Sequence, residues 1–126
     1  MIVDSSALVG ILREEPDSRV LLTAMGLAHR VSVGAPTVLE TTMVLGRRRK
    51  GHLADFLRGQ RVQVAPFTDA HLQAAQIAFD AYGRGSGSPA KLNFGDCMSY
   101  ALAKVTGEPL LFTGEDFTHT DITPAL

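Results

Sequence analysis

Short apolar runs alternate with helix-like segments along this chain, and this alternation constrains the fold more than any other feature. Strands are predicted at residues 1–3, 31–33, 62–64 and 110–112, with a candidate fifth strand at 121–123, and helices at 5–12, 16–27, 36–49, 53–57, 69–82 and 96–105. Strands that alternate with helices favour a parallel sheet covered on both faces. The sequence therefore predicts an α/β fold of three layers, with a central, mainly parallel sheet of four or five strands flanked by helices.

Length and composition predict one globular domain spanning residues 1–126. Cys97 is the only cysteine, so no intramolecular disulfide can form. No apolar run approaches the ~20 residues of a membrane span, and the N-terminus lacks the basic region of a signal peptide. We therefore expect a cytoplasmic protein without membrane association. The net charge of -1 argues against binding nucleic acid by bulk electrostatics, but not against a nucleic-acid enzyme whose acidic site and basic patch nearly cancel.

Four acidic residues lie where predicted strands give way to helices: Asp4, Glu40, Asp96 and Asp116. In a parallel sheet, the carboxyl ends of the strands and the N-termini of the following helices share one edge. We therefore expect the four side chains to converge. Their mutual repulsion raises their pKa values and costs stability unless a hard divalent cation neutralises them. The pattern predicts a metal site at this edge.

Each acid also has a structural interpretation. Glu40 could complete a capping box with Thr37, Asp96 could cap its own helix, and Asp116 could be a turn residue. Asp4 is harder to explain in this way, because a carboxylate directly after a buried strand needs donors or a cation. Independent caps need not share one edge of the sheet, so the coincidence favours the metal site.

Two hydroxyl residues, Ser6 and Thr113, flank the acidic edge and could position a metal-bound water. Helix capping explains Ser6 equally well. The histidines have neither metal-ligand nor catalytic-triad spacing, and we interpret them as surface or core residues; they are His29, His52, His71 and His119.

A basic run, Arg47, Arg48 and Arg49 followed by Lys50, falls in the last turn of the predicted helix 36–49. The structural interpretation is a solvated helix end in which cations complement the helix dipole. The functional one is contact with RNA phosphates. Arg47 would then lie about 10 Å from Glu40 along the same helix face.

Three segments of the chain, together with the helix carrying Glu40, resemble the PIN-domain ribonucleases; the segments are residues 1–8, 92–103 and 110–117. Among these ribonucleases, the chain resembles the VapC toxins of bacterial toxin-antitoxin pairs. The resemblance implies a PIN-like fold, RNA cleavage dependent on Mg²⁺ or Mn²⁺, homodimerisation and inhibition by a VapB antitoxin. It places the metal-binding acids at Asp4, Glu40, Asp96 and Asp116. Relatives often carry Asn where this chain has Glu115, so an extra carboxylate could join the site or change its metal preference.

Metal-assisted cleavage of RNA by a toxin is the leading hypothesis. Two alternatives are a non-catalytic module whose acids bind a basic partner peptide, and a metal-dependent phosphohydrolase of small molecules. We also expect surplus apolar residues on the helices between 5 and 49 to form a dimer contact and a groove for an antitoxin helix; they include Leu8, Leu12, Leu21, Leu22, Val44 and Leu45. The antitoxin would send an Arg into the acidic edge and assemble with the dimer as a heterotetramer or larger complex.

Overall fold

The computed structural model describes all residues, 1–126, and contains one sheet of four parallel strands in the order β3-β2-β1-β4. The strands are β1 (Ile2–Val3), β2 (Ser32–Gly34), β3 (Gln63–Ala65) and β4 (Leu110–Leu111). Ile2 of the central strand lies opposite Ser32 on one side and Leu110 on the other. The predicted mainly parallel α/β architecture is confirmed.

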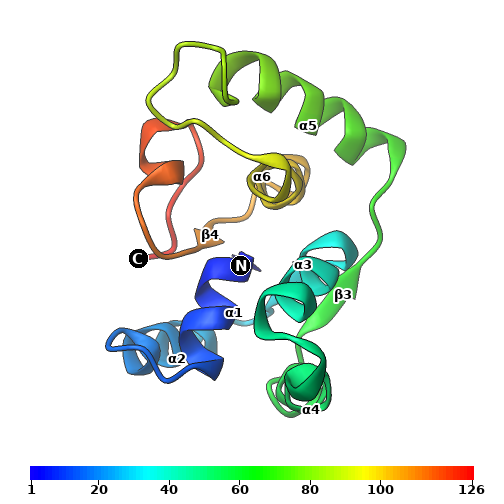
Figure 1. The fold of residues 1–126 in the computed structure, drawn as a ribbon, viewed down its shortest axis with the longest axis vertical. Coiled ribbons are helices and arrows are strands. Elements are labelled where there is room, and N and C mark those ends of the chain that lie inside the picture. Colours follow the sequence, from blue (N-terminus) through cyan, green and yellow to red (C-terminus); the bar gives the residue numbers. More distant parts are fainter.

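Six helices cover the two faces of this sheet (Figure 1). They are α1 (Ser5–Leu12), α2 (Ser18–Leu27), α3 (Ala35–Leu45), α4 (Lys50–Gly59), α5 (Asp69–Tyr82) and α6 (Phe94–Thr106), with 3₁₀ turns η1 (Arg47–Arg49) and η2 (Asp116–His119). Successive strand residues point to opposite faces. Accordingly, Ile2 and Leu110 belong to the core under α5 and α6, whereas Val3 and Leu111 belong to the core under α1, α2 and α4. The structure therefore has the predicted three layers.

The candidate fifth strand at 121–123 is wrong. This segment makes only an isolated bridge between Leu110 and Pro124, supported by hydrogen bonds from the Leu110 N–H to Thr123 and from the Ala125 N–H to Leu110, both 2.9 Å. Pro124 has no N–H, so it cannot extend a ladder of hydrogen bonds. The segment lies beside β4 without regular secondary structure.

The predicted helix 36–49 is also wrong at its C-terminal end. α3 stops at Leu45, and Gly46 adopts a φ of 88°, a conformation that costs glycine little. The basic residues then form the separate turn η1, which leads directly into α4, so Gly51 lies inside a helix and does not end one. Arg47 and Glu40 therefore do not share a face of one continuous helix.

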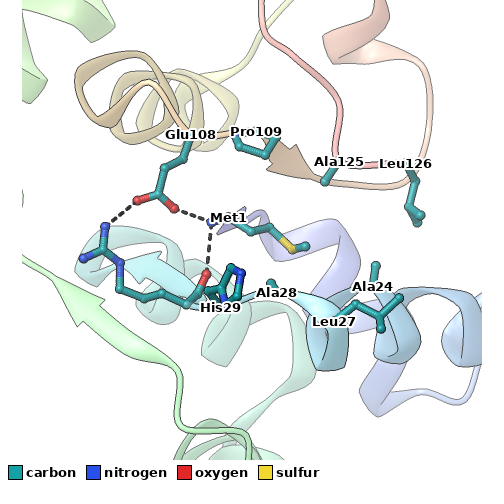
Figure 2. Close-up of a pocket in the computed structure, with 10 residues that line it drawn as sticks. Met1, Ala24, Leu27, Ala28, His29, Glu108, Pro109, Ala125 and Leu126 are labelled. Atoms are coloured by element: carbon teal, nitrogen blue, oxygen red, sulfur yellow. Dashed lines mark hydrogen bonds and ion pairs between the residues drawn. The ribbon is translucent and has the colours of Figure 1, made fainter.

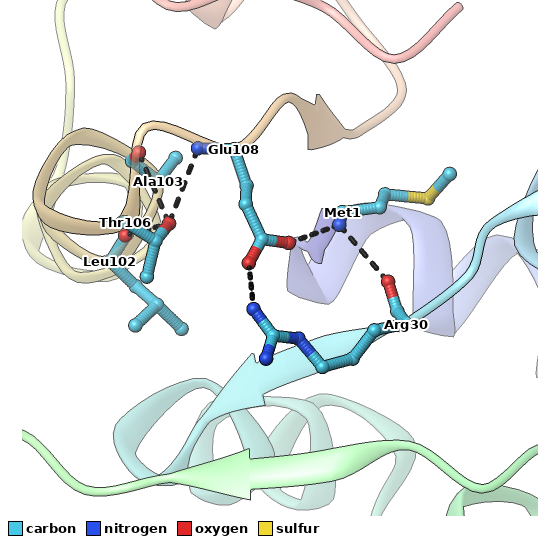
Figure 3. A network of polar contacts seen from close by, with 6 residues as sticks. All are labelled: Met1, Arg30, Leu102, Ala103, Thr106 and Glu108. Atoms are coloured by element: carbon cyan, nitrogen blue, oxygen red, sulfur yellow. Dashed lines mark hydrogen bonds and ion pairs between the residues drawn. The ribbon is translucent and has the colours of Figure 1, made fainter.

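The first residues of the chain tie the amino-terminal edge of the sheet together (Figure 3). The Met1 amine donates to the Arg30 carbonyl at 3.0 Å and to the Glu108 carboxylate, which also accepts from the Arg30 guanidinium at 2.8 Å. These ion pairs lower the pKa of Glu108. Figure 2 shows this network beside a largely apolar cavity of about 830 Å³. The cavity lies at the opposite edge from the predicted acidic site.

None of the helices is long and apolar enough to cross a membrane.

Candidate active site

Asp4 is the most deeply buried of the four acids, with 2% of its surface exposed. It follows β1 directly and is the N-cap of α1, so the capping interpretation of Ser6 is wrong. One carboxylate oxygen accepts from the Ser6 N–H at 3.0 Å and the Ser6 hydroxyl at 2.6 Å, and the other accepts from the Ser99 hydroxyl at 2.5 Å. These hydrogen bonds satisfy both carboxylate oxygens and fix the orientation of the side chain.

Ser99 was not identified from the sequence as a site residue. It lies on α6, is almost fully buried, and its hydroxyl also stands 3.3 Å from the Thr37 hydroxyl of α3. Thr41, one turn further along α3, donates to the Thr37 carbonyl at 2.7 Å. A sequence signal existed, because Ser99 lies three residues after Asp96, on the same face of an otherwise apolar helix. Together these hydroxyls form a polar seam that joins Asp4 to α3 and α6.

Ser6 and Thr113 meet at the same point. The Ser6 hydroxyl, besides donating to Asp4, accepts from the Thr113 backbone N–H at 3.1 Å. Both residues therefore lie beside the buried carboxylate, as the sequence predicts. Ser6 holds the Asp4 carboxylate, and its hydrogen bond with Thr113 joins the segments that follow β1 and β4. The positioning of a metal-bound water by these two residues stays a prediction.

Glu40 lies on α3 with its carboxylate against the backbone of α6. A Cβ atom placed on Gly95 would stand 1.7 Å from one Glu40 carboxylate oxygen, so the carboxylate can lie here only beside a glycine. The other oxygen, Oε1, is buried without a hydrogen-bond partner. Burial is the main cause that raises the pKa of Glu40; the Ser5 hydroxyl offsets part of the rise, and repulsion from Asp4 adds to it.

The capping-box interpretation of Glu40 is wrong. The N-cap of α3 is Gly34, which lies three residues before Thr37, and the Thr37 hydroxyl faces Ser99 instead of a free backbone N–H at the helix end. Pro36 at the start of the helix explains the shift, because proline favours the first helical turn, where its missing N–H costs nothing. Glu40 therefore has no capping role, and its Oε1 atom has no hydrogen-bond partner.

Asp96 lies in the first turn of α6, which begins at Phe94, two residues earlier than predicted. The Asn93 N–H donates to its carboxylate and its own N–H donates to the Asn93 side chain, both at 2.9 Å. The N-cap is thus Asn93, and Asp96 contributes to capping as the third helical residue of a capping box. Capping does not explain why the pKa of Asp96 is raised. Burial raises the pKa of Asp96 to about 6; the Asn93 N–H opposes the rise, and Asp4, Asp116 and Glu40 add to it.

Asp116 is exposed and opens η2, a few residues beyond β4. Its charge nevertheless contributes to the raised pKa of Asp96, which places it at the same edge of the sheet. Glu115 precedes it, is also exposed, and has no ion-pair partner. The structure thus brings together the four acids that the sequence singles out.

None of the four acids forms an ion pair with a cationic side chain of the protein. The four ion pairs of the structure involve other residues entirely. At the same time, no three His, Cys, Asp or Glu side chains are gathered closely enough to form a ready-made metal site. The unpartnered Glu40 oxygen and the raised pKa of Asp96 fit a divalent cation chemically, since carboxylate oxygens are the ligands that Mg²⁺ and Mn²⁺ prefer. The side chains would have to close around the ion on binding.

Two surface predictions need correction. The basic residues Arg47, Arg48 and Arg49 are exposed on η1, beyond the end of α3 that lies away from the acids, so Arg47 and Glu40 do not share a helix face. Their contact with RNA stays a prediction. The predicted apolar groove also fails in part, because Leu8 and Leu21 are core residues.

The exposed apolar surface lies elsewhere. Leu39 and Met43 of α3 are 62% and 73% exposed, and Phe94 at the start of α6 is 80% exposed. They line a cavity of about 710 Å³ that also includes Glu40. Apolar side chains that are exposed together in this way often mark a protein contact surface. An apolar surface therefore adjoins the acidic cluster directly.

Residues 1–122 match the family model described as PIN domain. The chain belongs to the PIN-domain family. Within it, this is a protein of the VapC group. It is 44% identical to Ribonuclease VapC42 and 42% identical to Ribonuclease VapC28, both of Mycobacterium tuberculosis, over 99% and 100% of its own length and 98% of theirs.

Solved structures agree with this fold. A chain of a toxin-antitoxin complex from Klebsiella pneumoniae aligns with a TM-score of 0.73 at 12% identity, covering 95% of this chain and 92% of that one. Mycobacterium tuberculosis VapC20, described as a sarcin-ricin loop cleaving toxin, aligns with a TM-score of 0.68 at 18% identity, covering 98% of each chain. At these identities the similarity concerns the fold alone.

Proposed function

We propose that this VapC-family protein is a metal-dependent endoribonuclease and the toxin of a toxin-antitoxin pair, acting in the cytoplasm. The observation that carries the proposal is the buried Glu40 carboxylate oxygen, which has no hydrogen-bond partner and lies among acids that make no ion pair. Burial and the neighbouring carboxylates also raise the pKa of Asp96. Such an arrangement costs folding stability, so a functional role is the simplest explanation for it. The relatives named as ribonucleases support RNA as the substrate.

Asp4, Glu40, Asp96 and Asp116 would hold Mg²⁺, for which Mn²⁺ could substitute, and Glu115 is a further candidate ligand. A divalent cation bound there supplies Lewis-acid polarisation of a phosphodiester and lowers the pKa of bound water. The protein's own part is positional. Ser6 and Ser99 hold the Asp4 carboxylate in one orientation. Glu40 keeps an unused carboxylate oxygen because Gly95 leaves it space.

Cleavage of RNA in the presence of Mn²⁺ or Mg²⁺, abolished by a chelator, tests this proposal. Asp4→Asn and Asp96→Asn should each lower the rate by at least about 100-fold, the upper end of what changes around metal ligands cost. Asp80→Asn is the matched control, because Asp80 is exposed on α5 and makes no ion pair. Circular dichroism must show folded variants. Equal activity of all three variants would exclude this site as the catalytic centre.

The two alternative functions give different results in the same assay. A non-catalytic binding module would release no RNA fragments under any metal condition. A small-molecule phosphohydrolase would turn over a generic phosphodiester as fast as RNA. Sequencing the 5′ ends of cleaved RNA would then identify the target, which depends on surface shape and loop contacts.

The partner that we propose is a VapB-type antitoxin, consistent with the toxin-antitoxin complex among the structural neighbours. An antitoxin helix would lie on the apolar surface of Leu39, Met43 and Phe94, next to Glu40, and an antitoxin Arg would pair with the carboxylates. We also propose that the chain forms a homodimer and a heterotetramer or larger assembly with the antitoxin. Met43→Asp should weaken antitoxin inhibition, whereas Val105→Asp, on the exposed side of α6, should not.

A further inference from the structure

The loop that joins α5 to α6 carries a cluster of cationic and polar groups beside the acidic edge. Arg84, Gly85, Gly87, Ser88, Lys91 and Asp116 line one cavity of about 660 Å³, and none of them is hydrophobic. In Figure 1 this yellow-green loop passes close to the orange η2 turn, which begins at Asp116. The cavity therefore brings two cations from one loop next to a carboxylate of the candidate active site.

The two cations have no partner within the protein. Neither Arg84 nor Lys91 takes part in any of the four ion pairs, and both are exposed. Asp116 lines the same cavity but is not paired with either of them. Lys104 is paired with Asp121 and Arg30 with Glu108, whereas Asp116 pairs with neither cation of its cavity. Arg84 and Lys91 are thus available to an anion.

The loop backbone is both held in place and open to a ligand. Its ends are closed by hydrogen bonds from the Arg84 N–H to Leu92 at 3.2 Å and from the Leu92 N–H to Tyr82 at 2.9 Å, and Ala90 is buried. Between these anchors, Gly85 and Gly87 have φ values of 87° and 88°, and nothing lies within 4 Å of where their side chains would be. Their N–H groups donate to no acceptor in the protein.

A phosphodiester backbone fits these features better than other anions do. Cationic side chains and free backbone N–H groups are the usual donors to nucleic-acid phosphates. Asp116 lines the same cavity and would repel a small anion that binds there alone. A phosphate held by Arg84 and Lys91 is therefore better explained as part of a chain that continues to the acidic edge. We propose that Arg84 and Lys91 hold an RNA phosphate next to the scissile one, so that the loop 83–92 positions the substrate for cleavage.

This inference rests on the proposed ribonuclease function. It assigns substrate positioning to the loop in place of the basic turn η1, which lies beyond the distal end of α3. The loop follows α5 and precedes the capping box of Asp96, so a substrate bound to it would reach the carboxylates without crossing the protein.

The test compares Arg84→Gln/Lys91→Gln with the wild type in metal-dependent cleavage. We expect KM for RNA to rise roughly tenfold and kcat to change little, because phosphate contacts act in binding. Binding of a short fluorescent single-stranded RNA, measured in the inactive Asp4→Asn background, should lose about 1.4 from its salt slope if each side chain neutralises one phosphate. Arg84→Lys/Lys91→Arg keeps both charges and should restore KM and slope.

The charge-matched control is Arg58→Gln/Arg61→Gln, which removes two exposed cations around the end of α4, at the opposite edge of the sheet. It should leave KM and the salt slope unchanged. If the wild type cleaves RNA, and the variant Arg84→Gln/Lys91→Gln has the same KM and salt slope, the inference about the loop is wrong but the proposed function stands. Loss of antitoxin binding without any loss of RNA binding would also overturn the inference about the loop. A wild type that cleaves no RNA would instead overturn the proposed function.

Discussion

At the scale of single residues, Gly95 decides where the Glu40 carboxylate can lie. A methyl group there would meet both Glu40 oxygens and the carbon between them, at 1.7, 2.8 and 2.4 Å. Because a glutamate side chain is flexible, we expect Gly95→Ala to displace the carboxylate and leave the fold intact. RNA cleavage should fall by about tenfold or more, as for changes around a metal site.

Gly51→Ala is the control for this substitution. Gly51 is also the second residue of its helix, and nothing lies within 4 Å of its added methyl group. It should keep full activity and equal or greater stability. A Gly95→Ala variant as active as Gly51→Ala would mean that the position of Glu40 does not matter for cleavage.

Asp96 gives a prediction for the pH dependence of stability without metal. Its folded-state pKa of about 6 lies above the ordinary value of 3.8, so the folded state binds the proton more tightly than the unfolded state. Stability is therefore lost as pH rises from about 4 to 6. Above pH 6, the free energy of unfolding of Asp96→Asn should exceed that of the wild type by about 1 kcal/mol after allowance for solvent screening, so the variant should unfold at higher temperature. This difference should vanish below pH 4. A constant difference across pH would contradict this.

At the scale of elements, the seam between β1, α3 and α6 depends on Ser99. Its hydroxyl reaches Asp4 across 95 residues of sequence and lies against Thr37. Ser99→Ala leaves one Asp4 oxygen and the Thr37 hydroxyl without this partner, which should cost about 1–3 kcal/mol of unfolding free energy in urea titration. It should also lower the rate of cleavage. Ser18→Ala, at the start of α2 and away from this seam, should do neither.

At the scale of the whole molecule, the amino-terminal edge of the sheet is closed by Glu108. The lowered pKa of this carboxylate stabilises the fold above its ordinary pKa of 4.5, and that stabilisation is lost as pH falls further. Glu108→Gln should therefore reduce stability at neutral pH by about 1 kcal/mol or less, because the partners are partly solvated. Thermal unfolding at pH 7 and pH 3 measures this, and the difference should shrink at pH 3. A deficit of equal size at both pH values would point to packing instead of charge.

The sequence by itself determined the α/β class, the order of the elements and the identity of the four acids. These follow from local patterns: apolar runs flanked by helical spacing, and carboxylates at the ends of strands that a parallel sheet must bring to one edge. Helix ends were less predictable. Gly46 and Gly51 look alike in sequence, but only Gly46 adopts the positive φ that ends a helix.

Only the tertiary structure decided which residues meet. The space that Gly95 leaves for Glu40, the hydrogen bond from Ser99 to Asp4, and the cavity that joins Arg84 and Lys91 to Asp116 all link segments distant in the chain. No periodicity encodes them, because local propensity depends on neighbours a few residues away, whereas these contacts depend on how α3, α6 and the loop 83–92 pack around one sheet edge.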